Sequence, residues 1–210
     1  MKCKICELRK ARRYCPGVGG DICSICCGNE REVTIDCPRS CPFLQEARVH
    51  EKYLPPDLKN RPYPDIDVTE KFLEQHPELV TWIGIGLGTA SEAEPRVVDA
   101  DVREALDAIA RSYRTLTHGL VYESRPVNPF AAAIFDRLQR SIQEFKDGTG
   151  TIGKHLRDSV VLACLVLFLR LAVDHNNGRP KGRAFIDVIA RQFHQEETAV
   201  PDASPRLIEL

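Results

Sequence analysis

Hydrophobic residues recur at helical spacing in the second half of the chain. Steps of four and three residues separate the members of the first stripe, which are Val102, Leu106, Ile109, Tyr113, Leu116 and Leu120. This spacing places all of them on one face of an α-helix. Asp101 can cap that helix, and Glu104 follows three residues later as its capping-box partner. The pattern therefore predicts an amphipathic helix that begins at about residue 101.

Three later segments are also predicted to be helical. Asn128 and Pro129 are typical of a helix start, and Gly148 is a natural stop. The stripe between them comprises Ile134, Leu138, Ile142 and Phe145. Residues 154–174 centre on VVLACLVLFL, a run too short to span a bilayer, which predicts a buried central helix. The last stripe, over residues 182–195, comprises Phe185, Ile189 and Phe193. Together these segments predict an all-α domain.

The helical pattern is weaker between residues 68 and 88. Short helical turns are predicted over residues 68–82, with an interruption at Pro77. Gly84, Gly86 and Gly88 then predict that no helix continues through the GIGLG segment. This segment lacks the spacing and the strand–helix context of a phosphate-binding loop, so we interpret it as a loop between helices.

A proline-rich segment separates two regions of different composition. Residues 51–66 contain four prolines, which predict a stiff and largely extended linker. Residues 1–50 contain only 14 hydrophobic side chains other than cysteine, too few to build a core. We therefore predict a small cysteine-rich finger over residues 1–50, an all-α helical domain over 67–196 and a flexible tail over 197–210.

Cysteine is the residue that changes this picture most, because eight of nine cysteines fall within the first 41 residues. The opening MKCKIC is not followed by the apolar stretch of an export signal, so we expect a cytoplasmic protein. Clustered thiols in a reducing compartment are more often metal ligands than disulfides.

The first candidate metal site consists of two C-x2-C pairs. Its proposed ligands are Cys3, Cys6, Cys23 and Cys26, with 16 residues between the pairs. This spacing lies in the range of structural zinc sites, in which two tight turns bring four sulfurs around one ion.

The other four cysteines form a second candidate set. They are Cys15, Cys27, Cys37 and Cys41, and they interleave along the chain with the first set. Cys26 and Cys27 are neighbours, and in extended chain their side chains point to opposite sides, so each can serve a different ion. We therefore expect two Zn²⁺ ions per chain. An iron–sulfur cluster is the less favoured alternative, because interleaved knuckles suit single ions better.

The cysteine-rich region resembles a known group of zinc fingers. Cys37 and Cys41 lead into PFLQEARVHEK, which is a plausible helix with Pro42 in its first turn. A knuckle, a short hairpin and a final helix with the last ligands resemble the treble-clef group. The interleaved ligands are similar to those of its cross-brace relatives, the RING, MYND and HIT-type fingers. This resemblance covers residues 3–50 and implies a small zinc-bound α+β finger, without implying an enzymatic activity.

The net charge and the position of the basic residues limit the kinds of partner that the chain can bind. The formal net charge of −1 excludes a strongly basic nucleic-acid protein by bulk charge, and no apolar run predicts a membrane span. A basic segment contains Arg9, Lys10, Arg12 and Arg13. These residues can contact phosphates or an acidic partner, or they can balance the charge of zinc-bound thiolates, which we favour. The basic loop over residues 176–183 is interpreted as a connector between helices.

These observations predict a function without catalysis. We identify no nucleophile–base constellation, so we expect a non-enzymatic protein that binds protein partners as an interaction or scaffold module. One alternative is a nucleic-acid-associated regulator that uses residues 9–13 and shows salt-dependent binding. A second alternative is a thiol redox or metal-responsive sensor with an exposed, low-pKa thiol.

Overall fold

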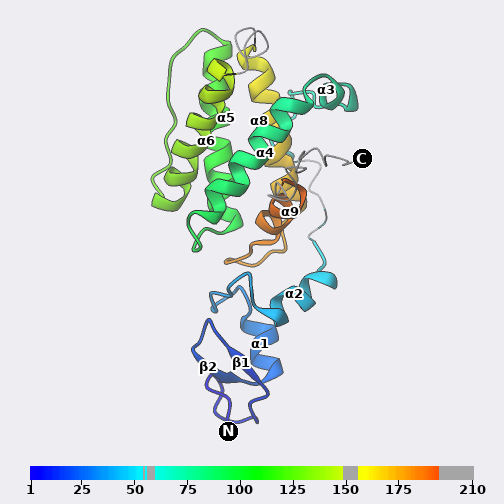
Figure 1. The fold of residues 1–210 in the computed structure, drawn as a ribbon, viewed down its shortest axis with the longest axis vertical. Coiled ribbons are helices and arrows are strands. Elements are labelled where there is room, and N and C mark those ends of the chain that lie inside the picture. The colour runs from blue at the N-terminus through cyan, green and yellow to red at the C-terminus, as the bar shows by residue number, and fades with distance from the viewer. Residues whose placement is uncertain (54, 56–59, 149–155, 194–210) are drawn as a thin grey trace, which may run out of the picture.

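The computed structural model describes residues 1–53, 55, 60–148 and 156–193. A small N-terminal finger lies at one end of the longest axis, and a larger helical domain lies at the other (Figure 1). Each has its own buried cluster, and the cluster of the finger is built mainly from cysteines. The described residues are mostly helical with one small sheet near the N-terminus, in agreement with the coarse fold expected from the sequence. The predicted tail lies outside the described residues.

The finger consists of one hairpin and two short helices. Strands β1 (Arg13–Cys15) and β2 (Gly20–Ile22) pair antiparallel. Gly19 turns the chain between them with φ of +63°, a conformation that glycine adopts without strain. Helix α1 (Ser24–Glu30) follows the hairpin directly, and helix α2 (Pro42–Val49) begins with proline at a position where its missing N–H costs nothing.

The helical domain is built around one central helix. Its helices are α3 (Glu70–Gln75), α4 (Pro77–Glu92), α5 (Asp99–Thr117), α6 (Pro129–Gly148), α8 (Asp158–Asp174) and α9 (Ala184–Phe193). Helix α8 packs against α5 and α4, while α4 also packs against α6 and α9. Most of α8 is buried, as its apolar run predicted. No helix in the described part of the chain is long and apolar enough to cross a membrane.

The start and end of α5 differ from the prediction. Val98, and not Asp101, is the N-cap residue, and the Asp101 carboxylate reaches back to accept a hydrogen bond from the Val98 N–H at 2.9 Å. Asp101 is therefore the N3 residue of a capping box, whose side chain accepts from the N-cap backbone N–H. Leu120 lies beyond the helix and is exposed, because Gly119 adopts a left-handed conformation with φ of +76° and ends the helical stripe.

The prediction that glycines end the helix at GIGLG is wrong, because α4 continues through all three. Tertiary packing explains the difference. A Cβ atom on Gly84 would lie 2.5 Å from the ring of Phe193 in α9, and one on Gly86 would lie 3.0 Å from the Ser141 hydroxyl in α6. The absence of side chains lets two neighbouring helices approach α4 closely, and this packing outweighs the low helix propensity of glycine.

Part of the proline-rich segment is held against the helical domain. The Arg170 guanidinium in α8 donates to the backbone carbonyls of Pro62, Tyr63 and Ile66. The Tyr63 hydroxyl also donates to the Asp107 carboxylate at 3.0 Å. These contacts fasten the chain just before α3 to the core helices.

Candidate metal centre

Four cysteine sulfurs meet within the finger. The ligand atoms of Cys3, Cys6, Cys23 and Cys26 all lie within 4.8 Å of one another. Three of these residues are buried, and Cys6 is partly buried. A tetrahedral zinc ion with Zn–S bonds of ~2.3 Å needs sulfurs about 3.8 Å apart, so the cluster can hold a metal ion such as zinc.

Local backbone structure aims these sulfurs inward. Cys3 and Cys6 lie on a tight turn in which the Glu7 N–H donates to the Cys3 carbonyl at 2.8 Å. Glu7 itself has a left-handed backbone with φ of +55°, which is costly for a residue with a side chain. Cys23 is the N-cap residue of α1, and its sulfur accepts a hydrogen bond from the Cys26 N–H at 3.4 Å. Two of the four ligands are therefore fixed by the start of one helix.

The electrostatics of the cluster favour a bound cation. Burial opposes ionisation of Cys3, but backbone N–H groups that donate to its sulfur lower its pKa to about 6. The Cys26 N–H lowers the pKa of Cys23 in the same way. Burial and the neighbouring sulfurs raise the pKa of Cys26 to about 12. Four adjacent thiolates repel one another unless a cation lies between them, and a divalent metal removes this conflict.

Arg9 supplies positive charge beside the cluster. Its guanidinium hydrogen-bonds to Cys23, and this contact together with the charges of Cys6 and Cys26 raises the pKa of Arg9. The side chain thus faces thiolates that a zinc ion alone would leave with a net negative charge. The counter-charge role of the basic segment stays a prediction.

The second set of cysteines lies on the side of the finger that carries α2. Cys15, Cys27, Cys37 and Cys41 are all buried and line one small apolar cavity, together with Ile22, Ile35, Phe43 and Leu44. Burial is the main cause that raises the pKa of Cys37, and the charges of Cys15 and Cys41 add to it. The structure thus brings all four residues to one cavity. Among the described residues, however, only the first set has all its ligand atoms within 4.8 Å of one another.

Cys26 and Cys27 face different sets, but not because the chain is extended there, as we expected from the sequence. Both lie in α1 and not in extended chain. Successive residues of an α-helix point about 100° apart, which is enough to turn Cys27 toward the second set.

The four basic residues of the N-terminal segment have different surroundings. Arg13 donates to the Cys27 sulfur at 3.7 Å, and its guanidinium lies 4.3 Å from the centre of the Phe43 ring. Arg9 faces Cys23, as described above. Lys10 and Arg12 have exposed side chains. Arg9 and Arg13 thus contact the cysteine sets, and of the four residues only Arg13 is partly buried, whereas Arg9, Lys10 and Arg12 are exposed.

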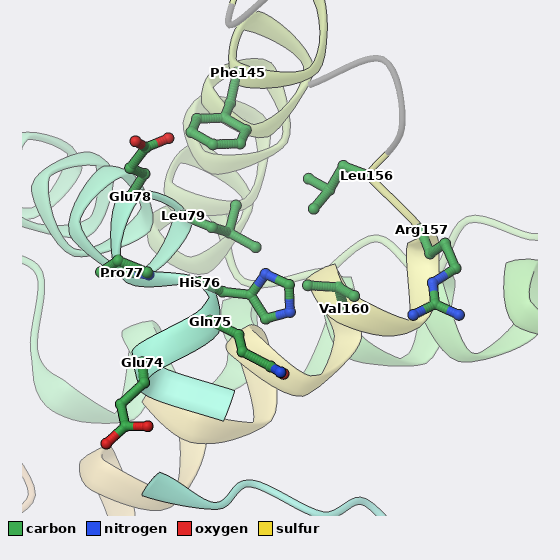
Figure 2. A pocket seen from close by; sticks show the side chains of 10 residues that line it. All are labelled: Glu74, Gln75, His76, Pro77, Glu78, Leu79, Phe145, Leu156, Arg157 and Val160. Atoms are coloured by element: carbon green, nitrogen blue, oxygen red, sulfur yellow. The ribbon is translucent and has the colours of Figure 1, made fainter. Parts of the chain in front are cut away.

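A different cavity, of about 510 Å³, lies where α3 meets α4. The His76 ring points into it between Leu79 and Val160, whereas the carboxylates of Glu74 and Glu78 point away (Figure 2). Among the described residues that line this cavity, both carboxylates therefore point away from the imidazole.

Sequence reasoning missed the contacts that join the finger to the helical domain. A buried carboxylate, Glu32, lies at their centre and contacts Arg48, Asn177 and Arg183. The basic loop over residues 176–183 was the only signal, and we interpreted it as a connector. Its contacts with Glu32 span about 145 residues of sequence, which no local pattern can reveal.

Comparisons with known protein families, with curated proteins and with solved structures found no match to this chain.

Proposed function

We propose that this chain is a cytoplasmic, zinc-binding, non-enzymatic protein that acts as an interaction or scaffold module. The observation that carries the proposal is the cluster formed by the first set of cysteines. Four thiolates complete the coordination of a zinc ion and leave no position for a reactive water. Zinc bound in this way stabilises a fold and does not catalyse a reaction, so the finger serves as a rigid surface.

The proposal includes a second zinc ion, held by Cys15, Cys27, Cys37 and Cys41. Their shared cavity supports this assignment. Cys41 is also the N-cap residue of α2, where the positive end of the helix dipole favours a thiolate. A hairpin followed by helices that carry ligands, with the two sets interleaved, is the arrangement of a treble-clef or cross-brace finger.

Exposed aliphatic side chains around the first site offer a surface for a protein partner. Ile5 lies between Cys3 and Cys6, Ile25 lies between Cys23 and Cys26, and Leu8 follows directly after the first turn. Leu8 is 83% exposed and Ile25 is 51% exposed. Large apolar side chains held in water by a metal-bound turn are typical of an interaction site.

Leu8→Asp is expected to abolish binding of protein partners without removing zinc, because Leu8 is not a ligand. The measurement is quantitative affinity purification of the full chain, compared with Val121→Asp. Val121 is 94% exposed in the helical domain and serves as the matched control. If Leu8→Asp and the control both retain every partner of the unmodified chain, the proposed interaction surface is wrong.

A nucleic-acid-associated role is the first of the two alternatives, and the exposed Lys10 and Arg12 support it. Arg9 and Arg13 face cysteine sulfurs, which leaves fewer free cations for phosphates. The protein-interaction role is therefore favoured. Binding to nucleic acid that falls steeply with salt concentration would reverse this order.

A further inference from the structure

A fully buried glutamate attaches the helical domain to the finger. Glu32 lies between α1 and α2, is 0% exposed and has a left-handed backbone with φ of +52°. Its carboxylate accepts hydrogen bonds from the Arg183 N–H at 3.1 Å and from Asn177 Nδ2 at 3.2 Å, and it pairs with the Arg48 guanidinium. Its carbonyl accepts from the Lys181 N–H at 2.8 Å. A buried carboxylate persists only when it is satisfied in this way.

Arg183 reaches from the start of α9 to the backbone of a cysteine in the second set. Its guanidinium donates to the Cys37 carbonyl at 2.8 Å and to the Asp36 carboxylate at 2.9 Å. The same side chain donates to the Val97 carbonyl at 2.8 Å, in the segment before α5. Arg183 is buried, whereas the Asp36 side chain is half-exposed. One side chain therefore ties the position of Cys37 to the helical domain.

Asp187 makes a second connection, on the next turn of α9. Its carboxylate accepts from Arg39 Nε at 2.8 Å and from Arg48 Nε at 3.1 Å. Arg39 lies between Cys37 and Cys41 in the sequence, and Arg48 lies in the helix that starts after Cys41. Both segments that flank the last two cysteines thus contact one carboxylate of the helical domain.

The finger segment that makes these contacts depends on its cysteines for shape. Residues 31–41 include no regular helix or strand, and the buried cluster around them consists mainly of cysteines. In such small units metal binding supplies the free energy that folds the chain. Without an ion at the second set, Glu32 and the Cys37 carbonyl would lose the positions that Arg183 requires.

We infer that metal binding at Cys15, Cys27, Cys37 and Cys41 and docking of the helical domain onto the finger are thermodynamically linked. This inference rests on the second zinc ion of the proposed function. Metal at this set holds the docked arrangement, and loss of metal releases the helical domain. Linkage is reciprocal, so the docked helical domain also strengthens metal binding at the second set. In the sensor alternative, loss of metal would therefore separate the helical domain from the finger.

The test uses a change in the helical domain that touches no cysteine. Asp187→Asn in the full chain is expected to weaken one of two bound zinc ions by about 5- to 150-fold, the usual range of such coupling, and to leave the other unchanged. Zinc retention is measured by native mass spectrometry against a graded series of chelator concentrations. Asp136→Asn is the matched control, because Asp136 pairs with Arg125 at 2.6 Å on the exposed side of α6. Both zinc affinities should stay unchanged in this control.

Lys181→Ala provides a second and milder variant, because Lys181 Nζ donates to the Thr34 carbonyl at 3.0 Å from an exposed position. It should weaken the same zinc ion in the same direction. Two bound zinc ions with unaltered affinities in both variants would overturn the linkage and leave the zinc proposal intact. A single zinc ion in the unmodified chain would instead overturn the second site, and the linkage with it.

Discussion

Replacement of Cys23 by serine is expected to remove the metal from the first site and to unfold the finger. Cys23 is both a proposed ligand and the N-cap residue of α1. Serine keeps the capping function, so the change isolates the loss of the ligand. Structural zinc supplies on the order of 10–16 kcal/mol of apparent binding free energy in small fingers, far more than a unit of this size can replace. Zinc content and the NMR spectrum of the finger residues measure the effect.

The helical domain should remain folded in this variant, at a lower melting temperature. Trp82 is the only tryptophan, and it packs against Phe145 within the helical domain, so its fluorescence follows that domain alone. Cys164→Ala is the matched control, because Cys164 is buried in the core of the helical domain and does not belong to the cysteine cluster of the finger. It should keep full zinc content and lose about 1 kcal/mol of stability. Retention of all metal by Cys23→Ser would contradict the assignment of the first site.

Glu32→Ala is expected to lower the free energy of unfolding by about 3–5 kcal/mol, because it leaves the buried Arg48 guanidinium without its main partner. Burial disfavours the charge of Arg48, but Glu32 and Glu51 more than offset this effect and raise its pKa above the ordinary value. Loss of the Glu32 carboxylate also leaves the Arg183 N–H, just before α9, without this acceptor. Urea unfolding followed by far-ultraviolet circular dichroism, which reports the helices of both units, measures the change.

Glu46→Ala is the control for this prediction. Glu46 lies on the exposed side of α2, and its removal should change stability by less than about 0.5 kcal/mol. Equal and small effects of the two substitutions would mean that the buried network does not join the two units.

The sequence was sufficient for features that depend on local spacing. The stripes after residue 100 predicted α5, α6, α8 and α9, and Pro77 marked the boundary between α3 and α4. The two C-x2-C pairs predicted the four sulfurs that meet in the structure. In each case residues a few positions apart determine which face or turn they occupy.

Features that depend on distant contacts were not predictable. The low helix propensity of Gly84 argued against a helix at this position. Its lack of a side chain, however, allows Phe193 to approach α4 closely. Glu32 looks like an ordinary surface acid in the sequence, and it is buried only because a loop about 145 residues away covers it. The contacts of Arg9 with Cys23 and of Arg13 with Cys27 likewise depend on where the fold places these sulfurs. Their sequence positions alone do not predict them.

The metal content of the purified full chain tests the central claim most directly. Native mass spectrometry and a visible absorption spectrum, on protein prepared without added metal, identify the ion and count it. We expect two zinc ions per chain and a colourless protein, because each proposed four-cysteine set would hold one ion without an open position. A chain without metal, or a brown protein that contains iron, would contradict it.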